Sequence, residues 1–404
     1  MTVGEAPLPR VWRIYAVCNF VSQIGGCMQS TAQAWLVLEM TESSSRLGLL
    51  VALQFIPSIL LAIPAGRAAD RWGRRKLLLG AQVAMALLAA ALAAVIAFKE
   101  VSYPVLLGFA LLLGIGNGLS QTTRLAMAAS LAGAQGRVRA AGLATFSFNL
   151  ARILGPSLAG FAMTLWGPAF AIAVNAASFL PLVLFLAGLR ADETVSRPVR
   201  DSGAKALRFL WTHASTRIPL LTLAVAGVFA VNMQTVVPAF ARLGLGLNAS
   251  GFGLLMSAAG VGACLGGLLQ WRRPAGSVLR ALAAVGGLSL CLLALSAIRD
   301  LLPATLAFIA FGVCSATVFS SASAAVQSSI PDPLRNAATS LQVTIVQSTN
   351  PLGGALSGWL LEQLGLYGGC AALGAATLAG VVTLALTHRG DLANFRSVPD
   401  TEWS

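Results

Sequence analysis

The side chains that could bind a small molecule recur at helical spacing along segments that are otherwise apolar. Asn19, Gln23, Ser30 and Gln33 fall within about 80° of arc when successive residues turn by roughly 100°. Amides and hydroxyls donate and accept hydrogen bonds, and a stripe of them is unfavourable against lipid. We therefore expect this face to line a polar cavity or to bond to a neighbouring helix.

Further polar faces occur near residues 117–124, 232–235 and 320–327. Isolated polar side chains also form hydrogen bonds between helices inside membranes, so both interpretations stay open at each position. The predicted substrate cavity comprises Asn19, Gln23, Ser30, Gln33, Asn117, Gln121, Arg152, Asn232, Thr235, Ser323 and Gln327.

Arg152 is the most unusual of these residues. It follows Arg139 by thirteen residues, which places it about 20 Å further along a helix and inside hydrocarbon. A cation at that depth needs a partner, yet none of the 14 acidic residues falls within a predicted membrane core. We expect Arg152 to contact an anionic substrate group, helix carbonyls or Asn149.

Acidic side chains near the first-half helices are few, which limits the mechanisms of energy coupling. Glu39 and Asp70 are the candidates for proton coupling. His213 and His388 lie near the ends of apolar segments and are expected at the surface. Because no phosphate-binding glycine loop, nucleophile motif or Cys/His cluster occurs, we expect no enzymatic activity, no cofactor and no metal.

The composition indicates a chain built for a bilayer. Hydrophobic residues make up 57% and charged residues 10%, far below the roughly 25% charged residues of soluble domains. A helical span needs about 20 apolar residues. The sequence therefore predicts an all-α membrane protein with twelve transmembrane helices, at about 12–37, 47–66, 77–98, 104–130, 140–164, 168–189, 218–241, 250–271, 279–298, 304–329, 336–360 and 366–387.

The basic residues predict the orientation. With both termini in the cytoplasm, 21 of the 27 Lys and Arg residues fall in cytoplasmic segments and four outside. This asymmetry follows the positive-inside rule and explains the net charge of +13 without a nucleic-acid partner. We expect a multi-pass protein of the cytoplasmic (inner) membrane that works as a monomer.

The chain divides into two pseudo-symmetric halves of six helices each. The predicted division is 1–189, a cytoplasmic connection 190–217, and 218–404. Glycines repeat between the halves: Gly66 with Gly266, Gly114 with Gly312, and Gly160 with Gly358, at offsets of 198 to 200. Such duplication is typical of secondary transporters. Within the connection, residues 205–211 are compatible with a short interfacial helix or a solvated linker.

One loop motif resembles the signature of the major facilitator superfamily. Between the second and third spans stands Gly66-Arg-Ala-Ala-Asp70-Arg71-Trp-Gly73-Arg74-Arg75-Lys76. The resemblance implies that its acidic residue helps to latch one conformation of a transporter. The predicted latch comprises Gly66, Asp70, Arg71, Gly73, Arg74 and Arg124, with Arg124 as the expected partner of Asp70.

Residues 20–25, 34–41 and 53–57 are similar to the macrolide-efflux and enterobactin-exporter branch of that superfamily. Gly155, Pro156 and Gly160 resemble a motif of drug antiporters and predict a helix kink. The resemblance implies export of a hydrophobic or amphipathic small molecule by alternating access, with protons as a coupling partner. A facilitative uniporter or importer, and a non-transporting receptor or scaffold, remain the alternatives.

Overall fold

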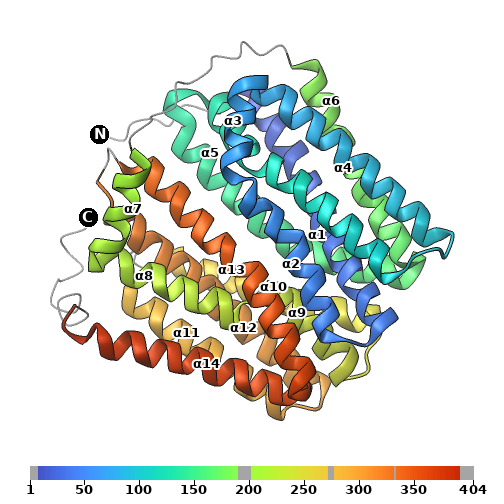
Figure 1. Cartoon of the computed structure of the whole chain (residues 1–404), viewed down its shortest axis with the longest axis vertical. Helices are drawn as coiled ribbons and strands as arrows, with labels where there is room; N and C mark the ends of the chain where they lie inside the picture. The colour runs from blue at the N-terminus through green and yellow to red at the C-terminus, as the bar shows by residue number, and fades with distance from the viewer. Residues whose placement is uncertain (1–7, 190–201, 272–276, 332–333, 392–404) are drawn as a thin grey trace. The chain divides into compact units, whose positions relative to one another are not determined.

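The structure is a computed structural model that describes residues 8–189, 202–271, 277–331 and 334–391 (Figure 1). Every regular element in this part of the chain is helical, which confirms the predicted all-α class. Each predicted apolar run coincides with a described helix or a series of helices. Eight helical stretches among the described residues are long and apolar enough to cross a membrane.

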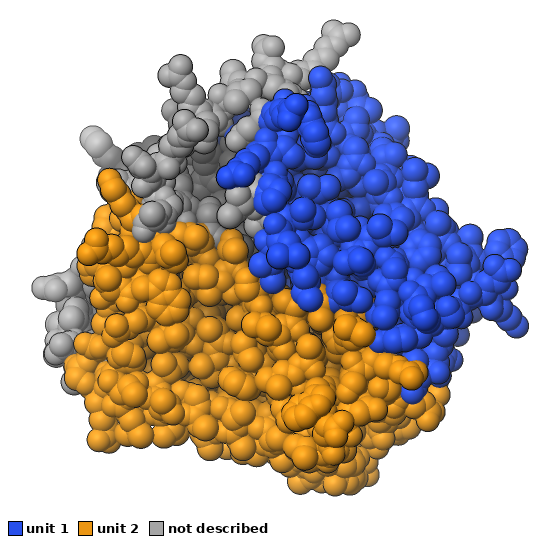
Figure 2. All heavy atoms as spheres, viewed as in Figure 1, with its two compact units in different colours: residues 1–41, 53–197, 248–253 blue, residues 42–52, 198–247, 254–404 orange. Residues whose placement is uncertain are grey.

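The chain forms two compact units (Figure 2), and unit 1 holds residues 1–41, 53–197 and 248–253. The helices of the first part of the chain are α1 (Arg10–Thr41), α2 (Ser44–Leu60), α3 (Ala62–Trp72), α4 (Arg74–Ala97), α5 (Tyr103–Ser178) and α6 (Leu180–Gly188). A buried cluster that includes Tyr15, Leu78, Met127 and Leu182 joins α1, α4, α5 and α6.

Two glycines divide the long helix α5 into three membrane segments. Gly133 has φ 71° and Gly167 has φ 81°, a region that residues with a Cβ rarely adopt. These breaks separate stretches that match the predicted spans 104–130, 140–164 and 168–189. The chain reverses at points where the sequence supplies glycine.

Unit 2 holds residues 42–52, 198–247 and 254–404. The helices of the second part of the chain are α7 (Ser202–Thr212), α8 (Ala214–Val225), η1 (Ala226–Ala230), α9 (Met233–Ala239), η2 (Phe240–Gly244), α10 (Ala249–Trp271), α11 (Val278–Ala297), α12 (Leu301–Ser328), α13 (Arg335–Gln363) and α14 (Gly365–Thr387). The first residues of α2 group with unit 2 and those of α10 with unit 1. The predicted division at 190–217 stays a prediction.

Two of the three repeated glycine pairs occupy equivalent helix contacts in the two units. A Cβ on Gly114 of α5 would lie 2.8 Å from the carbonyl oxygen of Gln54 on α2, and one on Gly312 of α12 would lie 2.7 Å from the amide nitrogen of Ala263 on α10. Glycine lets membrane helices pack with their backbones in contact. Two helix pairs related by the repeat therefore use the same contact.

The same holds for the repeated pair Gly160 and Gly358. A Cβ on Gly160 would lie 3.1 Å from the carbonyl oxygen of Ala249 at the start of α10, where Gly253 also packs, within unit 1. A Cβ on Gly358 of α13 would lie 2.9 Å from the Cα of Gly48 on α2, within unit 2. The repeat predicted from the sequence thus has a packing cause.

We expect Gly114→Ala and Gly312→Ala each to lower the free energy of unfolding by about 1–3 kcal/mol, because the added methyl forces two backbones apart. Gly108→Ala on the same helix as Gly114 is the matched control, since no atom lies within 4 Å of a Cβ at that position. Thermal unfolding of the purified protein in detergent measures the difference. Equal stability of Gly114→Ala and Gly108→Ala would contradict the packing argument.

Candidate functional site

Arg124 of α5 lies at the centre of a polar cluster inside unit 1. Its guanidinium donates to Asn19 Oδ1 at 3.1 Å, to Ser22 Oγ at 3.3 Å and to Gln82 Oε1 at 3.0 Å. The acceptors lie on α1 and α4, and all three residues are buried. Arg124 therefore connects three helices through hydrogen bonds to neutral groups.

The remaining contacts of this cluster complete its geometry. The Tyr15 hydroxyl donates to the Arg124 carbonyl oxygen at 2.9 Å, and Gln82 Nε2 donates to Ser120 Oγ at 3.2 Å. Arg124 Nε is buried and has no hydrogen-bond partner among the described residues. The side chain of Asp70 lies outside the described residues, so its pairing with Arg124 stays a prediction.

A second polar cluster joins α1 to α2 and α5 in unit 1. Gln54 donates through Nε2 to Gln33 Oε1 at 2.9 Å and accepts from the Ser30 hydroxyl at 3.2 Å. Next to Ser30 in the sequence, Gln29 accepts a hydrogen bond from Asn175. Ser30 and Gln33, predicted as cavity residues, are thus bonded between helices, which is the other interpretation of their polarity.

Sequence reasoning did not identify Ser22, Gln29, Gln54, Gln82 or Asn175 as members of these clusters. Gln54, Gln82 and Asn175 are single polar residues within apolar runs, whereas Ser22 and Gln29 stand beside other polar residues. Polarity alone marks such a position, but the matching acceptor or donor lies more than twenty residues away in the sequence. Only the packed helices identify the pairs.

Other predicted cavity residues are exposed within their own unit. Asn117 and Gln121 of α5 are exposed in unit 1, and Gln23 of α1 is half-buried with an Oε1 that has no partner among the described residues. In unit 2, Gln327 of α12 is exposed and Ser323 is half-buried. The exposed amides of α5 and α12 present polar atoms outward from helices long and apolar enough to cross a membrane, whereas Gln23 Oε1 is buried.

The predicted pair Asn232 and Thr235 lies at an interruption of a helix in unit 2. Regular helix stops at Ala230 and resumes at Met233, and Asn232 Nδ2 donates to the Val228 carbonyl oxygen at 2.9 Å. Thr235 is fully buried, and its hydroxyl has no partner among the described residues. Gly353 of α13 packs against Asn232, so a glycine accommodates the interruption.

Arg152 differs from Arg124 in its surroundings. The structure exposes Arg152 and places its guanidinium over the Phe148 ring, 5.9 Å from the ring centre. Asn149, its predicted neighbour, has a side chain outside the described residues.

In the predicted kink, Gly155 and Pro156 are buried, and a Cβ on Gly155 would lie 3.1 Å from the Ile24 carbonyl oxygen of α1.

The latch motif spans the junction of α3 and α4. Gly73 connects the two helices with φ 85°, and Arg71 is exposed while Arg74 is half-buried. The structure adds Arg75 to this region: its Nε donates to the Leu186 carbonyl oxygen at 2.6 Å, at the end of α6. Gly66 lies in α3, where a Cβ would meet no atom within 4 Å. The latch itself stays a prediction.

Carboxylates with described contacts lie at helix ends. Glu39 is exposed near the end of α1. Glu362 of α13 accepts hydrogen bonds from the backbone amides of Ser44 at 2.8 Å and Ser45 at 3.3 Å, at the start of α2. A carboxylate at this place satisfies free amides and favours the positive end of the helix dipole. No local sequence pattern predicts this contact, because 317 residues separate Glu362 from Ser45.

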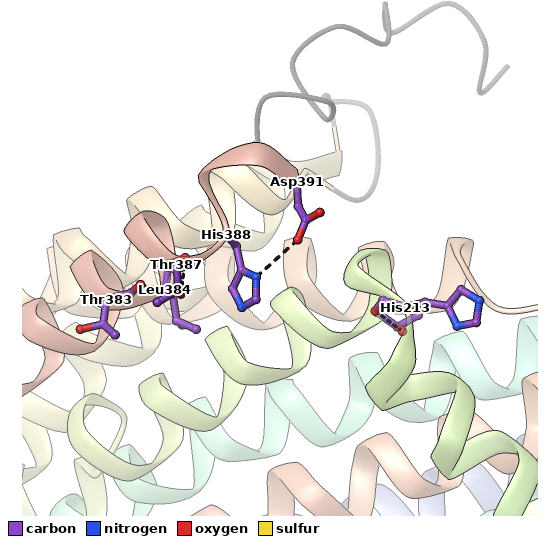
Figure 3. Close-up of polar contacts among 7 residues, drawn as sticks. His213, Thr383, Leu384, Thr387, His388 and Asp391 are labelled. Atoms are coloured by element: carbon purple, nitrogen blue, oxygen red, sulfur yellow. Dashed lines mark hydrogen bonds and ion pairs between the residues drawn. The ribbon is translucent and has the colours of Figure 1, made fainter.

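The two histidines lie near helix ends (Figure 3). His213 is exposed between α7 and α8, and His388 is largely buried beside Asp391, with Nδ1 and Oδ2 separated by 3.4 Å. Among the described residues, no group of three or more His, Cys, Asp or Glu side chains could hold a metal ion. The polar clusters around Arg124 and Gln54 contain amides, hydroxyls and one guanidinium.

Comparison with known proteins places this architecture in a family. The family model for MFS_3, described as transmembrane secretion effector, matches residues 3–403. The chain is also 24% identical to the multidrug efflux pump Tap of Mycolicibacterium fortuitum over 398 residues, covering 91% of this chain and 93% of that protein.

Solved structures share the fold at low sequence identity. A bacterial homologue of the human lysosomal transporter Spinster superposes with a TM-score of 0.71 at 16% identity, covering 96% of each chain. The D-xylose-proton symporter gives a TM-score of 0.71 at 17% identity, covering 92% of this chain and 97% of the symporter. Together with the family match, the all-helical fold and the polar clusters within it, these likenesses identify the chain as a membrane transporter of the major facilitator superfamily that belongs to the MFS_3 family, and not as an enzyme.

Proposed function

We propose that this transporter exports a hydrophobic or amphipathic small molecule by alternating access, with protons as the coupling ion. The similarity to the multidrug efflux pump Tap supports export. The charge asymmetry of the sequence supports a location in the cytoplasmic membrane with both termini inside. The substrate class rests on the resemblance to efflux proteins and on the chemistry of the exposed polar residues.

One observation carries the proposal: Asn117 and Gln121 are exposed on a helix that crosses the membrane. Uncharged amides facing lipid would lose their hydrogen bonds with water, which is unfavourable. The same amides facing a solvated substrate path keep those bonds and can exchange them for a substrate's polar groups. Neighbouring apolar surface on this helix suits an amphipathic rather than a fully polar substrate.

Everted membrane vesicles with an imposed proton gradient test this proposal. We expect them to accumulate labelled macrolides or other amphipathic compounds, and we expect Gln121→Leu to raise the KM about fivefold to tenfold, as for one lost hydrogen bond of about 1 kcal/mol. Leu112→Ala, at an exposed apolar position of the same helix, is the control and should leave uptake unchanged. If Gln121→Leu transports substrate with the wild-type KM, Gln121 does not line the substrate path.

The polar cluster around Arg124 is expected to stabilise unit 1. Gln82→Leu removes an acceptor from a buried cation and should lower the free energy of unfolding by about 1.5–3 kcal/mol. In a protein that already carries Arg124→Leu, Gln82→Leu should lower the free energy of unfolding by less, since the cation is absent. Gln121→Leu, an exposed amide on α5, is the stability control. Thermal unfolding of all variants measures the cycle, and equal effects of Gln82→Leu in both backgrounds would refute the coupling.

Proton coupling is tested at the exposed carboxylates at the end of α1. If Glu39 carries the coupled proton, Glu39→Gln should abolish uncoupler-sensitive accumulation while leaving passive equilibration intact, because a neutral amide cannot release a proton. Glu42→Gln is the matched control, as Glu42 is also exposed and three residues away. Parallel vesicles with Asp70→Asn test the other candidate carboxylate.

The alternatives predict different results in the same vesicles. A facilitative uniporter equilibrates substrate whether or not an uncoupler is present. A receptor or scaffold binds ligand without flux in either direction. Wild-type vesicles that show either behaviour across the whole panel of compounds would replace the exporter proposal.

A further inference from the structure

Helix α7 presents three chemically different faces. With about 100° between successive residues, Ala206 and Leu210 share one face, Leu207 and Trp211 the next, and Lys205 and Arg208 the third. Ala206 and Leu210 are fully buried, whereas Leu207 and Trp211 are 42% and 43% exposed. An ordinary amphipathic surface helix needs only a buried face and a polar face. The exposed apolar face of α7 would be unfavourable in water, so it is expected to contact another apolar surface.

The buried face fixes where α7 lies in unit 2. Ala206 and Leu210 pack in one cluster with Leu220 of α8, Val326 at the end of α12 and Ala338 near the start of α13. Figure 1 shows α7 beside the beginnings of α8 and α13. These contacts include the ends of two helical stretches long and apolar enough to cross a membrane, Ala214–Gly244 and Leu301–Ser328. Helix α7 thus covers the unit at the edge of the bilayer, where protein, lipid and water meet.

The turn after α7 holds it in this position. The His213 ring stacks on Phe209 at 4.0 Å between ring centres, and the Thr216 hydroxyl donates to the Leu210 carbonyl oxygen at 3.0 Å. Arg217 follows on the first turn of α8, and its buried Nε has no acceptor among the described residues. Two cations, Lys205 and Arg208, therefore lie exposed on α7, and a third, Arg217, lies on the first turn of α8.

We propose that α7 is a binding site for an anionic phospholipid. The membrane face, Leu207 and Trp211, enters the boundary between headgroups and acyl chains, where tryptophan is favoured because its ring is apolar and its N–H is polar. The cationic face, Lys205 and Arg208, binds the headgroup phosphate. Charge complementarity selects the lipid, since basic residues at a membrane surface are attracted to anionic headgroups. This site is separate from the proposed substrate path and does not rest on transport.

Fluorescence of Trp211 in lipid vesicles tests the proposal with the full chain. The protein is reconstituted in mixed phosphatidylcholine and phosphatidylglycerol, with bromine on the acyl chains of one lipid at a time. The difference between wild type and Trp211→Phe isolates the quenching of Trp211. We expect brominated phosphatidylglycerol to quench more strongly than brominated phosphatidylcholine, and added salt to reduce this preference.

Charge variants identify the residues that select the headgroup. Lys205→Gln with Arg208→Gln should reduce the preference for phosphatidylglycerol by about thirtyfold, as each basic residue contributes about 1 kcal/mol at an anionic surface. Arg10→Gln with Arg13→Gln removes the same charge from exposed positions on α1 and should leave the preference unchanged.

Two results would overturn the proposal. Equal quenching by the two brominated lipids would show that α7 contacts lipid without selecting the anionic headgroup. Absence of quenching would show that the membrane face is in water, as in a solvated linker. Both results need only the wild-type protein and Trp211→Phe, so they decide the proposal even if a charge variant fails to fold.

Discussion

Hydrogen bonding without water is the constraint on which the rest of this structure depends. Inside a bilayer, each polar group must find a partner within the protein or face a solvated path. Arg124 meets this requirement with neutral acceptors on two other helices, and Gln54 does so with Ser30 and Gln33. These bonds fix the rotation of α1, α4 and the first segment of α5 about their axes. They thereby determine that Asn117 and Gln121 point away from the packed interior of unit 1.

Close helix packing is the second consequence of the absence of water between helices. Lipid is as apolar as leucine, so membrane helices associate through contact and not through burial of apolar surface. Gly114 and Gly312 allow equivalent helix pairs in the two units to approach at the backbone. Two of the three repeated glycine pairs lie where a methyl group would separate the helices, whereas a Cβ on Gly66 would meet no atom within 4 Å. This explains why a faint repeat in sequence corresponds to a clear repeat in packing.

The contacts between helices differ in how many groups they involve. Contacts made by glycine backbones involve few side chains, and the bonds from Glu362 to Ser44 and Ser45 join only a helix end to a carboxylate. The polar cluster around Arg124, by contrast, connects three helices through three hydrogen bonds and stabilises unit 1 as a body.

The sequence by itself determined the helical class, the positions of the spans and the family, because apolar run length, glycine punctuation and a loop motif are local properties. It also marked polar positions such as Asn19, Gln33 and Arg152. Only the tertiary structure decided their environments: Asn19 and Gln33 are bonded between helices, whereas Arg152 is exposed. A helical wheel records the direction of a side chain on its own helix but not the neighbour it meets, and hydrogen-bond partners are set by packing between distant segments.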